Sequence, residues 1–368
     1  MMYTYIKNTL LVALLICTTA TCKCSSESND PEVPDKHETS QYFPGKDWET
    51  TSPETMGYSS EKFAALKTEI EKRLTTTHLM VVVSGKVIFS MGDLSYNAKI
   101  ASCRKSLLSM LYGKYVEDGT IDLEATLKDL KIDDIGGLLD IEKKAKVRHL
   151  ITARSGVFHP ASNTGDDYKY APARGSVEPG TYFLYNNWDF NCAGGIFEQL
   201  AGMDIYSAFY KDIALPIGMQ DYRLANQKKS GDLTLSKYPA YHFWISTRDM
   251  ARIGYLMLRE GEWDGQQIIS KDWVKTTTSV VTPRSEMNPS SRHSHEFDYG
   301  YLWWIFNKEF TGYDPTVYKD GYTATGLGGQ YITVLPQLDM VIAHKDINSQ
   351  MEKSTYYMLI KKIAECKQ

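Results

Sequence analysis

The chain has 368 residues, 42% of them hydrophobic, which is enough to bury a large core in one big domain or two modest ones. The formal net charge is −4 and no long basic run exists, so nothing in the charge points to nucleic acid or to an anionic membrane surface. The 25 Tyr and 7 Trp residues indicate aromatic-lined concave surface in addition to core packing.

The N-terminus has the pattern of a secretory signal. Lys7 precedes the apolar run TLLVALLIC (residues 9–17), which is followed by small residues and is too short to predict a membrane span. Cys22 and Cys24 then precede a polar stretch, as in a bacterial lipoprotein, although neither follows the small Gly, Ala or Ser of that pattern. We predict a leader over 1–24 and export to the periplasm or cell envelope, with Cys22 or Cys24 as the candidate lipid anchor to a membrane. The alternative is a weakly hydrophobic tail.

The rest of the chain predicts one domain over 46–368, preceded by a polar linker at 25–45. Strands near both ends can pair only if the ends of the chain come together. We therefore predict an α/β (α+β) fold with one antiparallel sheet flanked by the terminal helices and a mostly helical subdomain, with a ligand cleft between them. The predicted elements are a helix at 59–74, two strands within 78–92 around Ser84-Gly85, a helix at 102–116, a mostly helical insert at about 120–290, strands at 299–306, 316–326, 330–336 and 339–345, and an amphipathic helix at 354–366.

The stretch Ser102-Cys103-Arg104-Lys105 opens the second of these helices. Positions i and i+3 share a helix face, so Ser102 and Lys105 lie together on a polar face, whereas Cys103 belongs to the apolar stripe, where a thiol stays protonated and inert. A serine becomes a nucleophile when a neighbouring base takes its proton, and a lysine is such a base only where desolvation or nearby positive charge lowers its pKa. The pattern alone is weak, because Ser59 and Lys62 repeat it at an ordinary exposed helix start. A helix cap and a solvated lysine are the alternative.

Two further segments strengthen the chemical interpretation. Tyr185-Asn186-Asn187 is the one Tyr-x-Asn of the chain and precedes a helix rich in small residues. A tyrosine there could relay a proton between nucleophile and leaving group, and an asparagine could hold a substrate amide. The segment TATGLGGQYITVLP runs from glycines into a strand, which lets the backbone approach a ligand and offers an N–H from the strand edge.

Ser-x-x-Lys, Tyr-x-Asn and a Gly-rich strand start, in this order, resemble the serine beta-lactamase and penicillin-binding-protein-like hydrolases. The closest likeness is to the class C beta-lactamase-related branch of esterases, D-amino-acid peptidases and 6-aminohexanoate-oligomer hydrolases. It runs from about residue 50 to the C-terminus and includes YVEDGTIDLEATL, VRHLITARSGV and STRDMARIGYLML. The resemblance implies a beta-lactamase/transpeptidase-like fold, with Ser102 as nucleophile, Lys105 as base and Tyr185 as second general base or acid. It also implies that Asn187 faces the acyl side chain and that the backbone N–H groups of Ser102 and Leu327 form the oxyanion hole.

The third motif departs from the family's best-known form. Many members carry Lys-Thr-Gly or His-x-Gly, whereas this chain has Ala324 before Thr325 and Gly326, so the basic residue is absent. The resemblance places Thr325 and Gly326 beside the substrate, and the loss of the basic residue argues against efficient beta-lactam hydrolysis. It also places the bulky segment YHFWIST at the cleft, where Trp244 or His242 would narrow the acyl pocket. Buried aromatic packing is the alternative for both.

Other chemistries lack their residues. There is no Gly-x-Ser-x-Gly elbow, and GLGGQY lacks the third glycine of a dinucleotide-binding loop. His293 and His295 have no evident third metal ligand, so a solvated surface is the better interpretation. The three cysteines outside the leader are far apart and odd in number, which predicts small buried side chains and no disulfide framework.

We therefore predict a serine hydrolase that acts through an acyl-enzyme on an ester or amide, with a small-molecule or peptide-like substrate and no metal or organic cofactor. One alternative is a non-catalytic cell-envelope ligand-binding protein on the same fold, which the absent basic residue at Ala324 motivates. Another is a DD-peptidase or beta-lactamase, which differs from the first prediction in substrate only.

Overall fold

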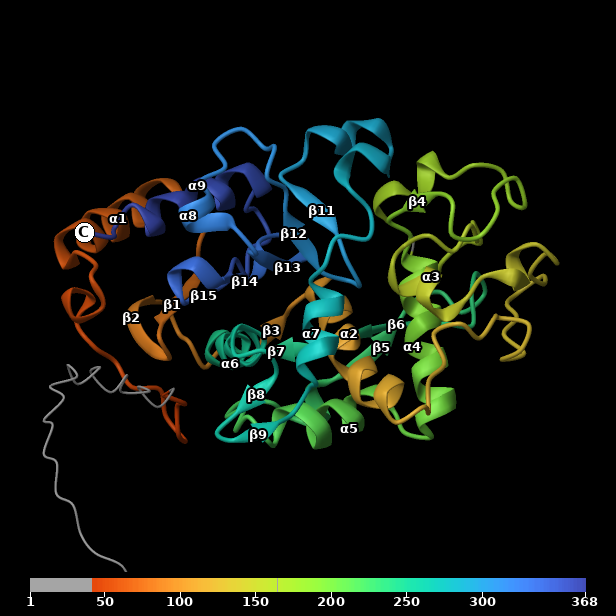
Figure 1. Ribbon diagram of the computed structural model, residues 1–368, viewed down its shortest axis with the longest axis horizontal. Coiled ribbons are helices and arrows are strands. Elements are labelled where there is room, and N and C mark those ends of the chain that lie inside the picture. Colours follow the sequence, from red (N-terminus) through yellow and green to blue (C-terminus); the bar gives the residue numbers. More distant parts are fainter. Residues whose placement is uncertain (1–41, 164) are drawn as a thin grey trace, which may run out of the picture. The chain divides into compact units, whose positions relative to one another are not determined.

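The computed structural model describes residues 42–163 and 165–368 (Figure 1). The predicted leader at 1–24, with its candidate lipidated cysteines, and the linker up to residue 41 lie outside the described residues. Within the described ranges, no helix combines the length and the apolar character needed to cross a bilayer.

A seven-stranded antiparallel sheet joins the two ends of the described chain, as predicted. Its strand order is β11-β12-β13-β14-β15-β1-β2. β1 (His78–Val83) pairs with β15 (Met340–Lys345) along its whole length, so an early strand lies beside the last one. β1 and β2 (Lys86–Met91) flank Ser84 and Gly85, whose φ angles of 50° and 81° suit a two-residue hairpin turn. The other strands are β11 (Phe297–Tyr299), β12 (Trp304–Phe306), β13 (Tyr322–Gly326) and β14 (Gln330–Leu335).

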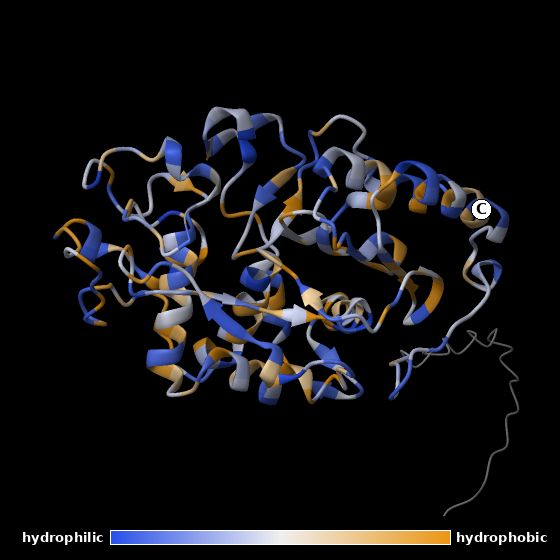
Figure 2. Ribbon diagram, turned by 180° about the vertical axis from the view of Figure 1, so that it is seen from behind, coloured by the Kyte–Doolittle hydropathy of each residue, from blue (hydrophilic) through white to orange (hydrophobic). Residues whose placement is uncertain are grey.

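Helices cover both faces of this sheet because side chains alternate along each strand. On β14, Ile332 faces α6 (Thr247–Leu258), where a Cβ on Gly254 would lie 3.0 Å from it. The neighbouring Tyr331 points the other way and stacks on Tyr356 of α9 (Lys353–Ala364), with ring centroids 3.7 Å apart. The first and last helices share that face, since α1 (Ser60–Arg73) packs against α9 and the Phe63 ring stacks on Phe89 of β2. Figure 2 shows hydrophobic and hydrophilic residues mixed along these covering helices.

The predicted helical insert at about 120–290 is less helical than expected. Loops, single turns and two- or three-residue strands separate its helices, and α6 within it belongs to the layers around the sheet. The C-terminal half also differs in detail: residues 315–318 form a short helix, and the predicted strand at 299–306 is two strands separated by a turn in which Leu302 has φ 64°. The remaining elements are β3 (Ala98–Lys99), α2 (Cys103–Glu117), α3 (Val147–Ile151), β4 (Phe183–Leu184), α4 (Asn187–Ala201), α5 (Ile205–Phe209), β5 (Lys228–Ser230), β6 (Ala240–His242), β7 (Trp244–Ile245), β8 (Glu262–Trp263), β9 (Gln266–Gln267), α7 (Lys271–Thr277), β10 (Met287–Asn288) and α8 (Pro315–Tyr318).

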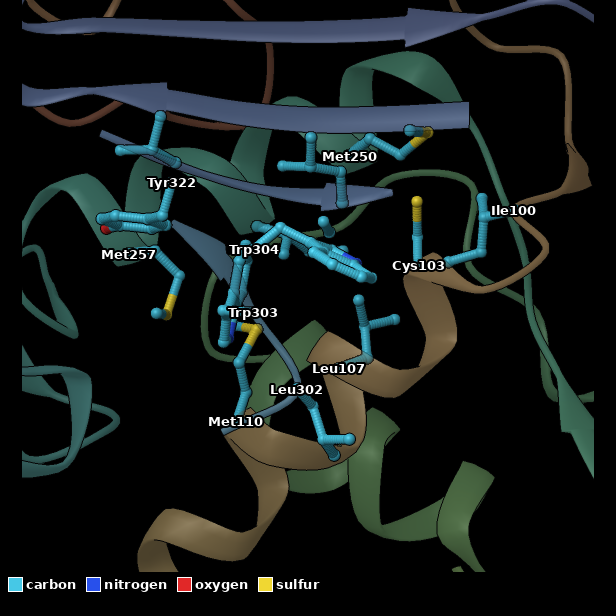
Figure 3. Packing of buried hydrophobic residues seen from close by; sticks show 14 of the residues in the cluster. Ile100, Cys103, Leu107, Met110, Met250, Met257, Leu302, Trp303, Trp304 and Tyr322 are labelled. Carbon is cyan, nitrogen blue, oxygen red and sulfur yellow. The ribbon is translucent and has the colours of Figure 1, made fainter. Parts of the chain in front are cut away.

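The insert at about 120–290, apart from α6, forms a second lobe beside the sheet. Helix α2 lies between the sheet and this second lobe and is buried on almost every side. Figure 3 shows Cys103, Leu107 and Met110 of α2 together with Trp303 and Met250 in the core. The polar face predicted for this helix is buried too, because α4, α5 and α7 pack around it. This burial sets the environment of the Ser102–Lys105 pair.

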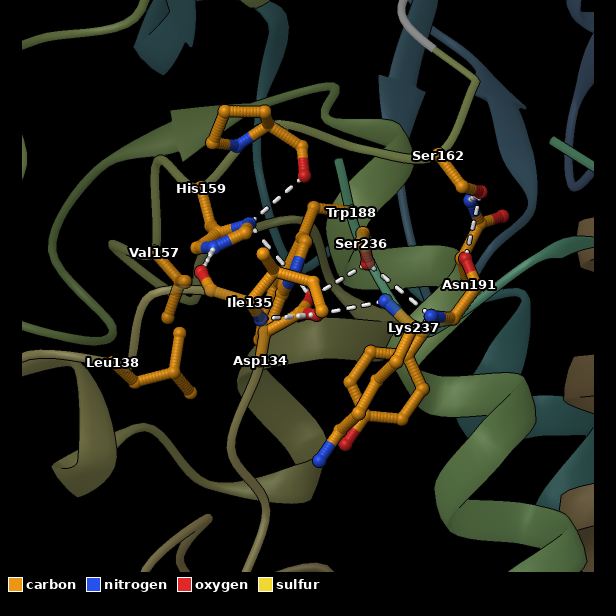
Figure 4. Close-up of polar contacts among 12 residues, drawn as sticks. Asp134, Ile135, Leu138, Val157, His159, Ser162, Trp188, Asn191, Ser236 and Lys237 are labelled. Atoms are coloured by element: carbon orange, nitrogen blue, oxygen red, sulfur yellow. Dashed lines mark hydrogen bonds and ion pairs between the residues drawn. The ribbon is translucent and has the colours of Figure 1, made fainter. Parts of the chain in front are cut away.

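A buried carboxylate ties the loops of the second lobe to α4 (Figure 4). Asp134 accepts hydrogen bonds from Trp188 Nε1 at 2.6 Å and from Ser236 Oγ at 2.5 Å. The backbone N–H groups of Ile135 and Lys237 donate to it at 2.8 Å each. Four donors from three segments compensate the carboxylate for its lost water and fix the start of α4, directly after Tyr185.

Candidate active site

Ser102 lies at the start of α2, directly after a sharp turn. β3 leads into this turn, where Ala101 adopts the left-handed region with φ 47°. The Cys103 N–H closes the turn by donating to the Ile100 carbonyl at 3.1 Å. A non-glycine residue held in this region is strained, and such strain gathers at functional sites. The turn places the partly exposed Ser102 at the positive end of the α2 dipole.

Lys105 joins Ser102 to a residue 80 positions further along the chain. Its Nζ lies 3.0 Å from Ser102 Oγ and 2.8 Å from Tyr185 Oη. The side chain is only 1% exposed, and Nζ lies 4.1 Å from the Tyr185 ring centroid and 4.5 Å from that of Phe190. The structure thus brings together the three residues predicted to be catalytic. Their order, hydroxyl–amine–phenol, permits a proton to pass along the set.

The Tyr185 ring is held by the segment that starts α4. Asn186 caps this helix by accepting a hydrogen bond from the Trp188 N–H at 3.1 Å, and its Nδ2 donates to the Val157 carbonyl at 2.9 Å. The Tyr185 ring packs against Phe190 at 4.8 Å and against Trp304 of β12 at 5.4 Å. Tyr185 therefore lies at the junction of the sheet and the second lobe, with its hydroxyl toward α2.

The Gly-rich hairpin between β13 and β14 lies beside the turn that precedes Ser102. A Cβ on Gly326 would stand 2.4 Å from the Ile100 carbonyl oxygen, so only glycine permits this approach. Leu327 follows and is 81% exposed. Across residues 42–163 and 165–368, neither the Ser102 nor the Leu327 N–H donates a hydrogen bond. Both N–H groups are thus available for an oxyanion, while Thr325, on the other side of Gly326, is largely buried.

A buried histidine anchors the same hairpin. His344 donates from Nδ1 to the Gly329 carbonyl at 2.8 Å, and its Nε2 accepts from Thr76 Oγ1 at 2.9 Å. Burial lowers the pKa of His344 to about 4, so the ring is neutral at physiological pH. His344 therefore has a structural role, and His159 likewise bonds two carbonyl oxygens.

Asn187 takes part in a chain of polar contacts that sequence reasoning missed. Its Nδ2 donates to the Asn163 carbonyl at 3.2 Å, and Asn163 Oδ1 accepts from Asn191 at 2.7 Å. Arg104, next to Lys105, completes the chain by donating from Nη2 to Asn191 Oδ1 at 2.7 Å. No local signal in the sequence pointed to Arg104 or Asn191, because Asn191 contributes through its position one turn after Asn187 and Arg104 through the packing of α2 against α4.

The segment around Trp244 lies beside the strand that leads to Ser102. β7 pairs with β3, so Trp244 stands opposite Lys99, and the Ile100 N–H donates to the Phe243 carbonyl at 3.0 Å. Trp244 is partly exposed, whereas His242 is buried with a pKa lowered to about 3 by burial and by nearby Arg104. Trp244 is therefore the better placed of the two to line an acyl pocket.

The structure confirms the prediction that the cysteines are small buried side chains. Cys103 is fully buried, its Sγ donates to the Gln330 carbonyl at 3.2 Å, and burial raises its pKa strongly, so its assignment to the core is confirmed. Cys192 and Cys366 are likewise free and buried. His293 bonds the Met287 carbonyl at 2.8 Å, and the described residues contain no cluster of three or more His, Cys, Asp or Glu that could hold a metal ion.

Comparison with known proteins gives information about the family and the fold of the chain. The family model described as Beta-lactamase matches residues 72–344. A putative 6-aminohexanoate-dimer hydrolase from Bacillus anthracis is 19% identical with TM-score 0.64, over 88% of this chain and 89% of that one. A family VIII carboxylesterase is 15% identical with TM-score 0.62, over 87% and 99%. At these identities the structural matches show the fold. An uncharacterized protein of Alkalihalophilus pseudofirmus is 28% identical over 107 residues, 27% of this chain and 29% of its own length.

Proposed function

Because the chain belongs to the beta-lactamase family of serine hydrolases, we propose that it hydrolyses an ester or amide through an acyl-enzyme on Ser102. One observation carries the proposal: the buried Lys105 Nζ lies 3.0 Å from Ser102 Oγ and 2.8 Å from Tyr185 Oη. Surrounding aromatic rings separate this amine from bulk water, and desolvation disfavours the charged form of a lysine, which is what allows it to act as a base.

In the acylation half, Lys105 accepts the Ser102 hydroxyl proton while Oγ attacks the substrate carbonyl carbon. The negative charge moves to the carbonyl oxygen, which the N–H groups of Ser102 and Leu327 would stabilise. The bond from the carbonyl carbon to the leaving oxygen or nitrogen then breaks, and the leaving group takes the proton through Tyr185. In the second half, water adds to the acyl-enzyme and gives up a proton to the same residues. The acid leaves and the serine hydroxyl is restored.

The substrate proposal favours esters and amides other than beta-lactams. Ala324 is buried in β13 and presents no positive charge at that strand position. Two of the structural neighbours are named as a carboxylesterase and a dimer hydrolase, which are names of ester and amide hydrolases. Because they are under 25% identical to this chain, they support the fold only. Export to the cell envelope remains a prediction from the N-terminal pattern.

Covalent labelling tests the proposal. Purified protein is incubated with a fluorophosphonate, and intact mass is measured for the wild type, Ser102→Ala and the matched control Ser59→Ala. We expect one adduct on the wild type and on Ser59→Ala, and none on Ser102→Ala. An unlabelled wild type would favour the non-catalytic ligand-binding alternative, and labelling that survives Ser102→Ala would place the nucleophile elsewhere.

A substrate panel then separates the reaction classes. It contains p-nitrophenyl esters, D-amino-acid amides and the beta-lactam nitrocefin. We expect turnover of an ester or amide and slow or absent turnover of nitrocefin. Rapid nitrocefin hydrolysis would contradict the weight placed on Ala324 and support the beta-lactamase alternative.

A further inference from the structure

We propose that Arg292 is a positioning residue for proton transfer, whose guanidinium charge favours the ionised form of the Tyr185 phenol. This inference rests on the proposed function and deepens it. It assigns a role in the reaction to a loop that lies more than a hundred residues from Tyr185 in sequence and that carries none of the three motifs.

The geometry places the guanidinium against the catalytic phenol. Arg292 lies in a 3-10 turn over Ser290–Ser294 and is only 7% exposed. Its Cζ stands 5.5 Å from the centroid of the Tyr185 ring and 5.5 Å from that of Trp304. A phenolate spreads its charge into the ring, so a cation over the ring stabilises the ionised form more than the neutral phenol.

Arg292 is held in place by one ion pair and keeps one buried donor unpaired. Its Nε donates to Asp167, which lies in the 3-10 turn over Asp166–Tyr170. Its Nη1 is buried without a hydrogen-bond partner in the described part of the chain. Leaving a guanidinium nitrogen unpaired costs stability, so packing alone does not account for an arginine here.

Three elements of the described chain present charged or titratable groups to Tyr185. Lys105 of α2 contacts the hydroxyl, Arg292 faces the ring, and Tyr299 of β11 packs edge-on with its ring centroid 6.1 Å away. Burial raises the pKa of Tyr299 well above its ordinary value, so this neighbour is neutral. The positive charge of Arg292 lowers the pKa of Tyr299, but burial has the larger effect. Beyond this layer, Lys353 of α9 stands 6.0 Å from the Trp304 ring, and Asp167 partly offsets the charge of Arg292.

The test measures the pH dependence of acylation. A unit charge at this distance shifts a pKa by on the order of 1–2 units in a protein, and the Asp167 carboxylate reduces this to about one unit. We measure the second-order rate of fluorophosphonate labelling and kcat/KM for a p-nitrophenyl ester from acid to alkaline pH. Lys105 Nζ lies between Ser102 Oγ and Tyr185 Oη, so an ionised Tyr185 draws the serine proton through Lys105, and the acidic limb reports the ionisation of Tyr185. In Arg292→Gln this limb should move up by about one unit. The rate should then fall about tenfold on that limb and converge on the wild-type rate at high pH.

Two further variants separate charge from packing. Arg292→Lys keeps the charge and should restore most of the wild-type profile. Asp167→Asn removes the opposing charge and should move the limb to lower pH, opposite to Arg292→Gln. A uniform loss of rate at every pH, with no movement of the limb, would assign Arg292 a structural role and overturn the proposal. Unchanged pH profiles in both Arg292→Gln and Asp167→Asn would also overturn the proposal. If Arg292→Gln does not fold, the pH profiles of Arg292→Lys and Asp167→Asn still test it.

A spectroscopic titration gives a readout that does not require turnover. The phenolate absorbance of the wild type minus that of Tyr185→Phe isolates the Tyr185 transition, which should move to higher pH in the Arg292→Gln background. An unmoved transition would overturn the role of Arg292 even where labelling of Ser102 succeeds. Failure of the proposed function is recognised separately, because the wild type itself would then remain unlabelled.

Discussion

Replacing Lys105 with methionine separates the chemistry of the amine from its packing. Methionine is unbranched and fills nearly the same space, but it removes the group that lies 3.0 Å from Ser102 Oγ and 2.8 Å from Tyr185 Oη. Loss of a general base typically costs 10²–10⁴ in rate, so we expect the labelling rate to fall by about 10³. This fall corresponds to about 4 kcal/mol of transition-state stabilisation.

The same change should leave stability nearly unaltered. Burying a polar amine costs about 1–3 kcal/mol in lost hydration, and its hydrogen bonds contribute about 0.5–1.5 kcal/mol each in return. Because Lys105 makes two such bonds and is 1% exposed, these contributions largely offset. We expect the free energy of unfolding to change by less than about 2 kcal/mol.

The assay pairs fluorophosphonate labelling rates with denaturant unfolding of each variant. The chain contains its own matched control in Lys62, the lysine of the second Ser-x-x-Lys pattern, whose Nζ contacts the carbonyl oxygens of Glu365 and Lys367 at the protein surface. Lys62→Met should label at the wild-type rate. A Lys105→Met rate within tenfold of wild type would refute the base assignment, and so would a loss explained entirely by unfolding.

Three further predictions concern stability. Asp134→Ala leaves four donors without their acceptor, of which Trp188 Nε1 and Ser236 Oγ are buried. It should lower the free energy of unfolding by about 3 kcal/mol in a denaturant titration, and a loss below about 1 kcal/mol would mean that the surrounding loops rearrange. Gly254→Val puts a Cβ 2.5 Å from Val341 Cγ1. It should lower the free energy of unfolding by about 1–3 kcal/mol in the same denaturant titration, and an unchanged unfolding midpoint would show that α6 shifts freely on the sheet. His344 has a native pKa of about 4, which is below its value in the unfolded chain. Between about pH 6.5 and pH 4 the unfolded chain therefore binds more protons than the folded one. The free energy of unfolding should fall as the pH drops through this range, by up to about 3 kcal/mol from this group. His344→Gln should flatten that part of the stability–pH curve, and an unchanged slope would contradict the assignment.

The parts of the fold that were predicted correctly are those with strong local signals. The hairpin around Ser84-Gly85, the α1 cap at Ser59 and the amphipathic α9 follow from short-range spacing and turn chemistry. The wrong secondary-structure predictions lie in segments where the local sequence pattern and the tertiary contacts favour different structures. Residues 315–318 follow a capping Asp314 and form a short helix instead of a strand. The insert at 120–290 contains long loops between its helices, and buried polar contacts such as those of Asp134 join these loops to α4.

The candidate residues for the chemistry could be named from the order of short motifs along the chain. A serine and a lysine three positions apart share a helix face, but this spacing alone was weak. The order of the three motifs and the family resemblance that it carries added Tyr185 and Leu327 to the candidate set. Packing between distant segments distinguishes the two equivalent Ser-x-x-Lys patterns, because it buries the lysine of only one of them beside a phenol. Lys62 contacts surface carbonyls, whereas Lys105 is enclosed by rings that belong to another lobe. Arg292 depended on tertiary structure alone, because its distance from Tyr185 results from two loops packing together, and no spacing along the chain encodes that contact.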